Sequence, residues 1–118
     1  MEKKLHYNLT VRLYAKEKCF GPGVAQLLHR VQRLHSLRAA AMDMDMAYSK
    51  AWKIVRQAET QLGFPLLHSV TGGKGGGGAE LTDKALNMLL AYDRFCEDLD
   101  QHAQMLFQER FAAWENES

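Results

Sequence analysis

Residues 36–81 decide the fold of this chain, and they read SLRAAAMDMDMAYSKAWKIVRQAETQLGFPLLHSVTGGKGGGGAEL. Six of the chain's nine glycines surround Lys74 within this stretch. Glycine loses more backbone freedom on folding than any other residue, so such a run indicates either a slack linker or a backbone that approaches another group closely. Short β-compatible segments flank the run, Leu66–Val70 before it and Ala79–Leu81 after it. The pattern predicts a β-hairpin over 66–81 whose long loop carries one cation.

Two helices are predicted immediately before this hairpin. Ser36 is a favourable N-cap for a short alanine-rich helix over 36–44. After a short polar turn, apolar residues recur at helical spacing, which predicts an amphipathic helix over 47–62 that Gly63 ends. These apolar residues are Ala51, Val55, Ala58 and Leu62. The two helices have the proportions of a helix-turn-helix over 36–62, and the hairpin after them makes the arrangement a winged helix-turn-helix.

A strand and a further helix are predicted on the N-terminal side. Residues 5–14 alternate between apolar and polar side chains, which is the pattern of a half-buried β-strand. A turn at Gly21-Pro22-Gly23 then leads into an amphipathic helix over 24–35. The predicted fold class is therefore α+β and mainly helical, with all elements in one domain over 1–118.

The C-terminal part of the chain predicts one long helix over 82–114, because it contains neither glycine nor proline. Thirty residues of helix extend about 45 Å, which is more than a small core covers. Apolar residues form a heptad-like seam along it, so the same helix of a second copy is expected to cover the seam in a homodimer. The residues expected at this dimerisation seam are Leu89, Tyr92, Cys96, Leu99, Ala103 and Leu106.

Composition and charge bound the function further. The chain is 47% hydrophobic and 25% charged, and it has neither a run of 18 apolar residues nor a charged-then-apolar leader, so a cytoplasmic protein without a membrane partner is expected. Cys19 and Cys96 are expected to be structural thiols in a reducing compartment.

The net charge of +1 conceals an asymmetry along the chain. Residues 1–35 carry +5 (seven basic, two acidic), residues 36–78 carry +2 (five basic, three acidic) and residues 79–118 carry −6 (three basic, nine acidic). The first two thirds could meet a polyanion, which the last third would repel.

The outer side of the predicted helix over 47–62 carries side chains suited to DNA. Such a helix fits the major groove, its first residues reach base edges, and the wing follows the backbone. Arginine and glutamine can each form two hydrogen bonds to guanine and adenine respectively, and lysine serves phosphate or guanine. The residues expected to contact DNA are Arg38, Tyr48, Ser49, Lys50, Lys53, Arg56, Gln57 and Lys74. Residue types alone leave a second interpretation open, in which this is simply the solvated side of a half-buried helix.

Several motifs together resemble a known family. They are Gly21-Pro22-Gly23, Ala39-Ala40-Ala41, Met46-Ala47-Tyr48-Ser49-Lys50-Ala51-Trp52, Leu62-Gly63-Phe64-Pro65-Leu66, the glycine run from Thr71 to Ala79, and Leu81-Thr82. In this order, and over about residues 5–99, they resemble the N-terminal DNA-binding domain of ModE-type molybdate-responsive transcription regulators, which is related to the winged helix of LysR-type regulators. The resemblance implies a homodimeric repressor or activator that reads DNA with the helix over 47–62 and regulates genes of molybdate transport or of molybdenum enzymes.

The chain departs from the family's pattern in three respects. Asp45 stands where the family usually has a glycine in the turn, and Ala47 where it has a capping serine. Ser49-Lys50 replaces a pair of basic residues, so a different target sequence is expected. Finally, the chain ends at Ser118 without the molybdate-binding module of longer members, so it is either a stand-alone DNA-binding half or a fragment, and molybdate is not expected as its ligand.

Other functions fit the residues less well. The glycines over 73–78 match a dinucleotide-binding fingerprint, but the acidic residues that should follow lie within a predicted helix. Lys74 is followed by glycine, which excludes a P-loop. The five histidines lack metal-ligand spacing, and no nucleophile, base and oxyanion set is present, so no enzyme, cofactor or metal site is expected. The remaining alternative is a dimeric winged-helix module that binds protein instead of specific DNA.

Overall fold

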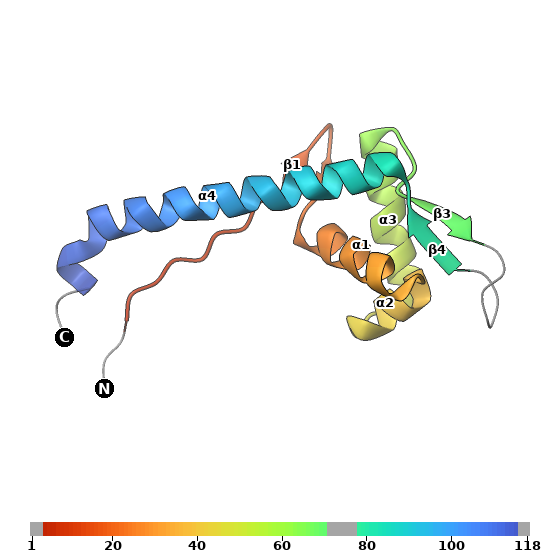
Figure 1. The fold of residues 1–118 in the computed structure, drawn as a ribbon, viewed down its shortest axis with the longest axis horizontal. Coiled ribbons are helices and arrows are strands. Elements are labelled where there is room, and N and C mark those ends of the chain that lie inside the picture. The colour runs from red at the N-terminus through yellow and green to blue at the C-terminus, as the bar shows by residue number, and fades with distance from the viewer. Residues whose placement is uncertain (1–3, 71–77, 116–118) are drawn as a thin grey trace.

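The computed structural model describes residues 4–70 and 78–115, and it confirms the α+β, mainly helical winged helix-turn-helix fold. Figure 1 shows a small head, built from the first three helices and a hairpin, at one end of a long C-terminal helix. The elements in chain order are β1 (Leu13–Tyr14), β2 (Lys18–Phe20), α1 (Pro22–Leu34), α2 (Leu37–Asp43), α3 (Tyr48–Leu62), β3 (Leu67–Val70), β4 (Gly78–Leu81) and α4 (Asp83–Glu115). None of the helices in the described ranges combines the length and apolar content needed to cross a bilayer.

The core lies where α1, α2 and α3 meet the first turns of α4. Its largest fully buried side chains come from β2, α1, α3, the segment before β3 and α4, and each contributes roughly 1.5–3 kcal/mol relative to an exposed position. They are Phe20, Leu27, Leu28, Val31, Val55, Leu66 and Leu89. Because α3 contributes to this core through one side only, its opposite side is fixed toward solvent.

The helix-turn-helix is present as α2 and α3. The Ser36 hydroxyl oxygen accepts a hydrogen bond of 3.0 Å from the Ala39 N–H, so the predicted N-cap is confirmed. Asp45 adopts the left-handed conformation, with φ of 54°, which is the conformation that glycine adopts without steric cost. Ala47 begins α3 without a side-chain cap, and Gly63 ends the helix with φ of 84°. The tight turn is thus retained despite the aspartate at its centre.

The predicted wing is an antiparallel pair of strands, β3 and β4, in a register that runs from Leu67 opposite Leu81 to Val70 opposite Gly78. The glycine-rich tip, including Lys74, lies outside the described residues. The base of the wing is joined to the end of α1, because the Ala79 N–H donates a 3.0 Å hydrogen bond to the His35 carbonyl oxygen. The orientation of the wing is therefore tied to the helix that supports α3.

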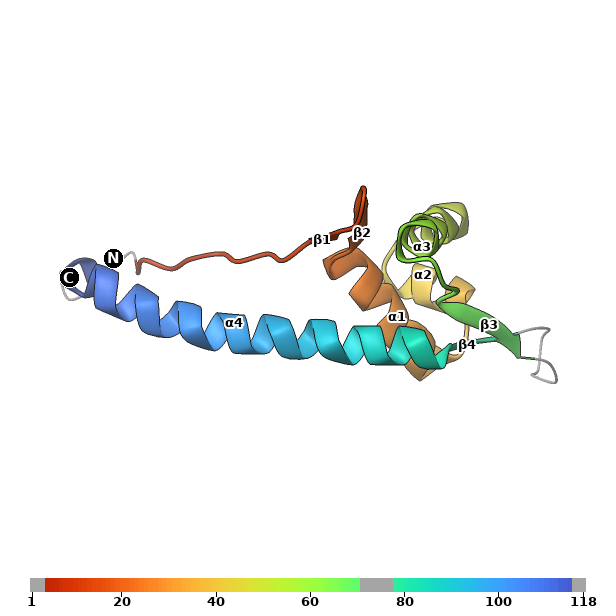
Figure 2. The ribbon, with the colours of Figure 1, turned by 90° about the horizontal axis from the view of Figure 1, so that it is seen from above.

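The predicted strand over 5–14 is wrong for most of its length. Only Leu13–Tyr14 forms a strand, paired with β2, whereas residues 4–12 are extended without a ladder and run alongside α4 (Figure 2). The Tyr7 hydroxyl donates a 2.6 Å hydrogen bond to the Asp100 carboxylate, and the Tyr7 ring lies 5.2 Å from the ring of Phe107. Of the apolar residues that alternate here, Tyr7 and Val11 are half-buried, whereas Leu5 and Leu9 are 43% and 45% exposed, so packing accounts for only part of the pattern. Alternation identifies an extended backbone, but not whether a neighbouring strand exists to pair with it.

The long helix is present as α4, with one residue of non-helical conformation at Phe111. The structure corrects the seam assigned to it. Leu89 and Tyr92 are buried in the head of the same chain, at 1% and 6% exposure, so they hold α4 to its own core. Farther along, Leu99 is half-buried and Leu106 is 52% exposed. Only this distal part of the seam is available to another molecule.

Candidate nucleic-acid interface

The outward side of α3 carries the polar residues that the sequence singled out. Ala51, Val55 and Ala58 are at most 1% exposed and fix the rotation of the helix. At 100° per residue, the polar positions then fall on the opposite side. The exposed members of the predicted set on α3 are Ser49, Lys50, Lys53, Arg56 and Gln57.

One flank of this side is a stack of rings and guanidinium groups, which we call the aromatic ladder and which consists of Arg38, Tyr48, Trp52 and Arg56. The Arg38 guanidinium lies 4.1 Å from the Tyr48 ring centroid, and the Arg56 guanidinium lies 5.3 Å from that of Trp52. The two rings meet edge to face at 6.2 Å. Cation–π contacts of this kind contribute about 0.5–1 kcal/mol at exposed sites and restrict where the guanidinium lies.

The ladder includes a residue that the sequence interpretation missed. Tyr48, Trp52 and Arg56 follow one another at steps of four, so they share one flank of the helix. That spacing was visible in the sequence and could have pointed to Trp52. The approach of Arg38 from α2 depends on how the two helices pack, and only the structure shows it. The consequence is that the guanidinium groups of Arg38 and Arg56 are held on one flank of α3, at positions suited to contact with a polyanion backbone.

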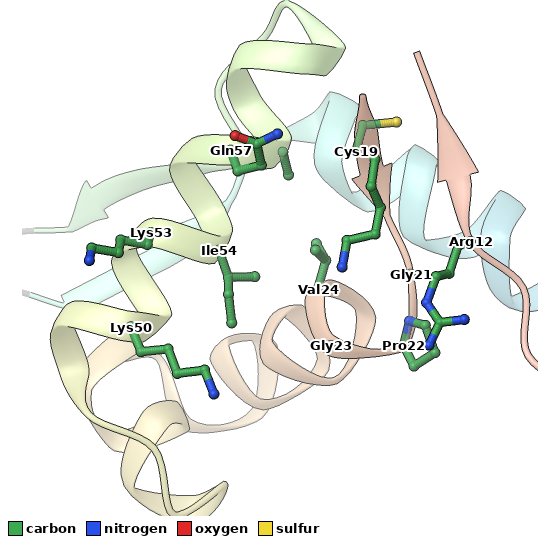
Figure 3. Close-up of a pocket in the computed structure, with 12 residues that line it drawn as sticks. Arg12, Cys19, Gly21, Pro22, Gly23, Val24, Lys50, Lys53, Ile54 and Gln57 are labelled. Carbon is green, nitrogen blue, oxygen red and sulfur yellow. The ribbon is translucent and has the colours of Figure 1, made fainter. Parts of the chain in front are cut away.

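The other flank borders a hollow that we call the basic groove, between α3, the start of α1 and the β1–β2 hairpin (Figure 3). Its volume is about 360 Å³. Lys50, Lys53 and Gln57 line it from α3, while Arg12 and Lys18 line it from the hairpin side. Figure 3 shows Lys50 extending toward α1, whereas Lys53 points away from the hollow. Arg12 and Lys18 were not among the predicted site residues, because no local pattern connects them to a helix about 35 residues away.

The cations around α3 lack local compensation. Within residues 4–70 and 78–115, no carboxylate lies within 4.0 Å of the basic groups that line the basic groove. The arginines on α1 differ, because Arg30 and Arg33 contact the Asp43 carboxylate at 2.7 and 3.3 Å. Hydrogen bonding and charge from Arg30, with a smaller effect of Arg33, lower the pKa of Asp43. The cations that line the basic groove therefore carry uncompensated positive charge next to α3.

Most of the acidic residues in the last third of the chain lie on α4. His29 on α1 pairs with Asp93 of that helix at 2.7 Å. Farther along α4, the Asp100 carboxylate accepts hydrogen bonds from Tyr7 and Gln104. Figure 1 shows α4 extending away from the head that carries α3. In this geometry the cations next to α3 are separated from the acidic residues on α4. The surface at α3 is therefore suited to binding a polyanion.

Comparisons with known proteins agree with this geometry. Residues 24–86, more than half of the chain, match the family described as bacterial regulatory helix-turn-helix protein, lysR family. The chain is 29% identical over 116 residues to the molybdenum transport protein ModE of Herbaspirillum seropedicae, covering 98% of this chain and 37% of that protein. It is 34% identical over 88 residues to the transcriptional regulator ModE of Haemophilus influenzae, covering 75% and 34%. It is 33% identical over 86 residues to the DNA-binding transcriptional dual regulator ModE of Escherichia coli, covering 72% and 32%.

These matches confirm the resemblance to the N-terminal domain of ModE-type regulators. The chain spans about one third of the length of the curated relatives it matches. The matched segment 24–86 includes α2, α3 and both strands of the wing. The chain belongs to the lysR family of bacterial regulatory helix-turn-helix proteins.

Proposed function

We propose that this chain is the DNA-reading part of a transcription regulator that binds a specific operator as a homodimer and controls genes of molybdate transport or of molybdenum enzymes. The observation that carries the DNA-binding proposal is the outward side of α3. It presents Ser49, Lys53 and Gln57 to solvent, between the aromatic ladder on one flank and the uncompensated cations of the basic groove on the other. Similarity to the molybdenum transport protein ModE of Herbaspirillum seropedicae supports the link to molybdenum. A protein with this role would act in the cytoplasm, where the bacterial chromosome lies.

In the proposed complex, α3 enters the major groove and the two flanks contact the phosphates on either side. The side chains of Lys53 and Gln57 would read base edges, because they project from the middle of the exposed side. Arg38 and Arg56 would position the helix on the backbone through the orientation that the aromatic rings give them. The wing would follow the adjacent backbone, with Lys74 at its tip.

The homodimer is proposed from the distal part of α4. Phe95 and Leu106 are each 52% exposed, and Leu99 lies between them on the same side of the helix at steps of four and seven. Exposed apolar residues in such a row are typical of a helix that packs on another helix. A second α4 would cover this row and place two reading helices on one duplex.

The proposal is tested by fluorescence anisotropy with a labelled duplex from upstream of the gene and a random duplex of equal length. We expect tighter binding to the upstream duplex, and a log–log salt dependence with a slope of about −0.9 for each phosphate contacted. Equal and weak binding of both duplexes at low salt would refute specific DNA binding. That result would favour the alternative, a winged-helix module that binds protein.

A further inference from the structure

The basic groove has a composition that backbone phosphates alone do not explain. Its floor is apolar and is formed by Val24 of α1 together with Ile54 and Ala58 of α3. Pro22 and Cys19 extend this apolar surface toward the hairpin. A phosphate of the DNA backbone could meet the cations at the rim, but it would leave the floor uncovered.

Around this floor the groove is cationic. Arg12, Lys18, Lys50 and Lys53 all line it, and its lining contains no acidic residue. As described above, no carboxylate of the described residues pairs with these cations. The Lys53 ammonium points away from the hollow, so the positive groups that repel one another there are those of Arg12, Lys18 and Lys50, and an anion bound among them would relieve that repulsion.

The size of the groove also suits a small molecule. Its volume of about 360 Å³ exceeds that of an inorganic oxyanion. Pockets for small ligands commonly occupy about 300–1,000 Å³ and combine an apolar lining with a few placed polar groups. Position 23 adjoins open space, because a Cβ built on Gly23 would meet no atom within 4 Å.

We infer that the basic groove binds a small organic anion, with the anionic group among Arg12, Lys18 and Lys50 and an apolar body on the Val24, Ile54 and Ala58 floor. The site goes beyond the proposed function, since binding of the anion does not require DNA. Lys50, Lys53 and Gln57 belong both to the groove and to the reading helix. An occupied groove therefore lowers the affinity for DNA, by neutralising cations and by competing for them, and DNA lowers the affinity for the anion by the same factor.

The test uses the whole chain with phenyl phosphate, inorganic phosphate and phenol as probes at equal ionic strength, followed by amide resonances in NMR spectra. Phenyl phosphate is expected to shift the amides of Lys18, Gly23 and Ile54, and to bind roughly tenfold more tightly than inorganic phosphate, because it also buries a ring. Phenol, which lacks the anionic group, is expected to cause no such shift. Absence of the shifts with phenyl phosphate, or equal binding of all three probes, would overturn the inference.

Two pairs of variants locate the site. Gly23→Leu fills the groove and is expected to abolish the phenyl phosphate shifts, whereas Gly23→Ala leaves the space open and retains them. Lys18→Gln removes one lining cation and is expected to weaken binding roughly threefold. Lys16→Gln, an equal charge change at an exposed residue of the same hairpin that does not line the groove, is expected to leave binding unchanged. Equal effects within either pair, in chains whose circular dichroism shows the native fold, would contradict the assignment.

The consequence for DNA rests on the proposed function and is measured separately. Phenyl phosphate is expected to weaken DNA binding by the native chain but not by Gly23→Leu. If Gly23→Leu alone abolished DNA binding without any probe, the groove would be a backbone-phosphate site and the inference would fail. If the amide shifts appeared in a chain that bound no DNA, the anion site would stand and the proposed function would fail.

Discussion

The backbone of Gly78 lies directly against the carbonyl oxygen of His35, and a Cβ added to this glycine would lie only 2.7 Å from that oxygen. Real Cβ atoms essentially never approach a backbone oxygen so closely. Next to it, the Ala79 N–H donates its hydrogen bond to the same oxygen. Gly78, the last residue of the glycine run, is therefore needed as a glycine where the wing meets the end of α1, because a Cβ atom would not fit there.

Gly78→Ala is expected to lower the free energy of unfolding by about 1–3 kcal/mol, because the added methyl group would overpack a backbone contact. Urea denaturation measures the change. Gly23→Ala is the control, since its methyl group meets open space in a helix and is expected to be neutral or to stabilise by up to about 1 kcal/mol. Equal free energies of unfolding of the two variants would contradict this, because the junction would then accommodate the added methyl group without loss of stability.

Lys53→Ala is expected to change the preference among DNA sequences, at a cost of about 1–3 kcal/mol on the best duplex, because its position on α3 suits base contact. Lys74→Glu is expected to weaken binding to all duplexes by nearly the same factor, because a residue at the wing tip would meet phosphates. Anisotropy titrations against the upstream and random duplexes separate the two effects. An equal loss of preference in both variants would reverse these assignments.

The aromatic ladder predicts an energetic coupling between Trp52 and Arg56. If the Trp52 ring positions the guanidinium for phosphate contact, Trp52→Leu and Arg56→Ala are expected to be non-additive in DNA affinity, by about 0.5–1 kcal/mol. A double-mutant cycle measures this coupling. Trp52→Phe is the control that retains a ring at this position, and it is expected to restore most of the coupling. Additive effects would mean that Trp52 only packs against its neighbours.

Leu99→Asp is expected to raise the dimer dissociation constant tenfold or more, because a tenfold change corresponds to about 1.4 kcal/mol and one buried leucine side chain contributes at least that much. DNA binding should weaken in parallel, because two half-sites are read jointly. Analytical ultracentrifugation measures the assembly. Gln101→Asp introduces the same side chain at an exposed position on the opposite side of α4 and is expected to leave the dimer intact. A native chain that sediments as a monomer at micromolar concentration would contradict the proposed dimer.

Tyr92 predicts a loss of stability at alkaline pH. Burial, assisted by the Cys96 thiol, raises the pKa of Tyr92 to about 12 from 10.0, and its hydroxyl donates a 2.7 Å hydrogen bond to the Val11 carbonyl oxygen. Because the fold favours the protonated phenol, this contribution is complete below about pH 10 and is lost as the pH rises through about 12.

Urea denaturation of Tyr92→Phe tests this contribution. The variant is expected to lose about 1 kcal/mol at neutral pH and to show a flatter decline of stability on the alkaline side. Tyr14→Phe is the control, since Tyr14 is 66% exposed and the loss of its hydroxyl is expected to leave the free energy of unfolding at neutral pH unchanged. A pH profile of Tyr92→Phe that matches the native one would contradict the assignment.

Much of the fold was predictable because its signals are local. Ser36 and Gly63 mark the ends of helices through their own backbone and side-chain chemistry, and the structure places both as predicted. The polar side of α3 was predictable for the same reason, since helical periodicity alone identifies which residues face outward. The strand over 5–14 failed because a ladder depends on a distant partner, and here α4 takes that place.

The sequence by itself determined the helix-turn-helix, the wing and the identity of the exposed side chains on α3, because hydrophobic periodicity and capping act over a few residues. Only the tertiary structure decided which surfaces meet. It placed Leu89 and Tyr92 in the head, brought Arg38 over Tyr48, and gathered the basic groove from the hairpin, α1 and α3. The physical reason is that packing joins residues far apart in the chain, and the shape of that contact depends on all the elements together.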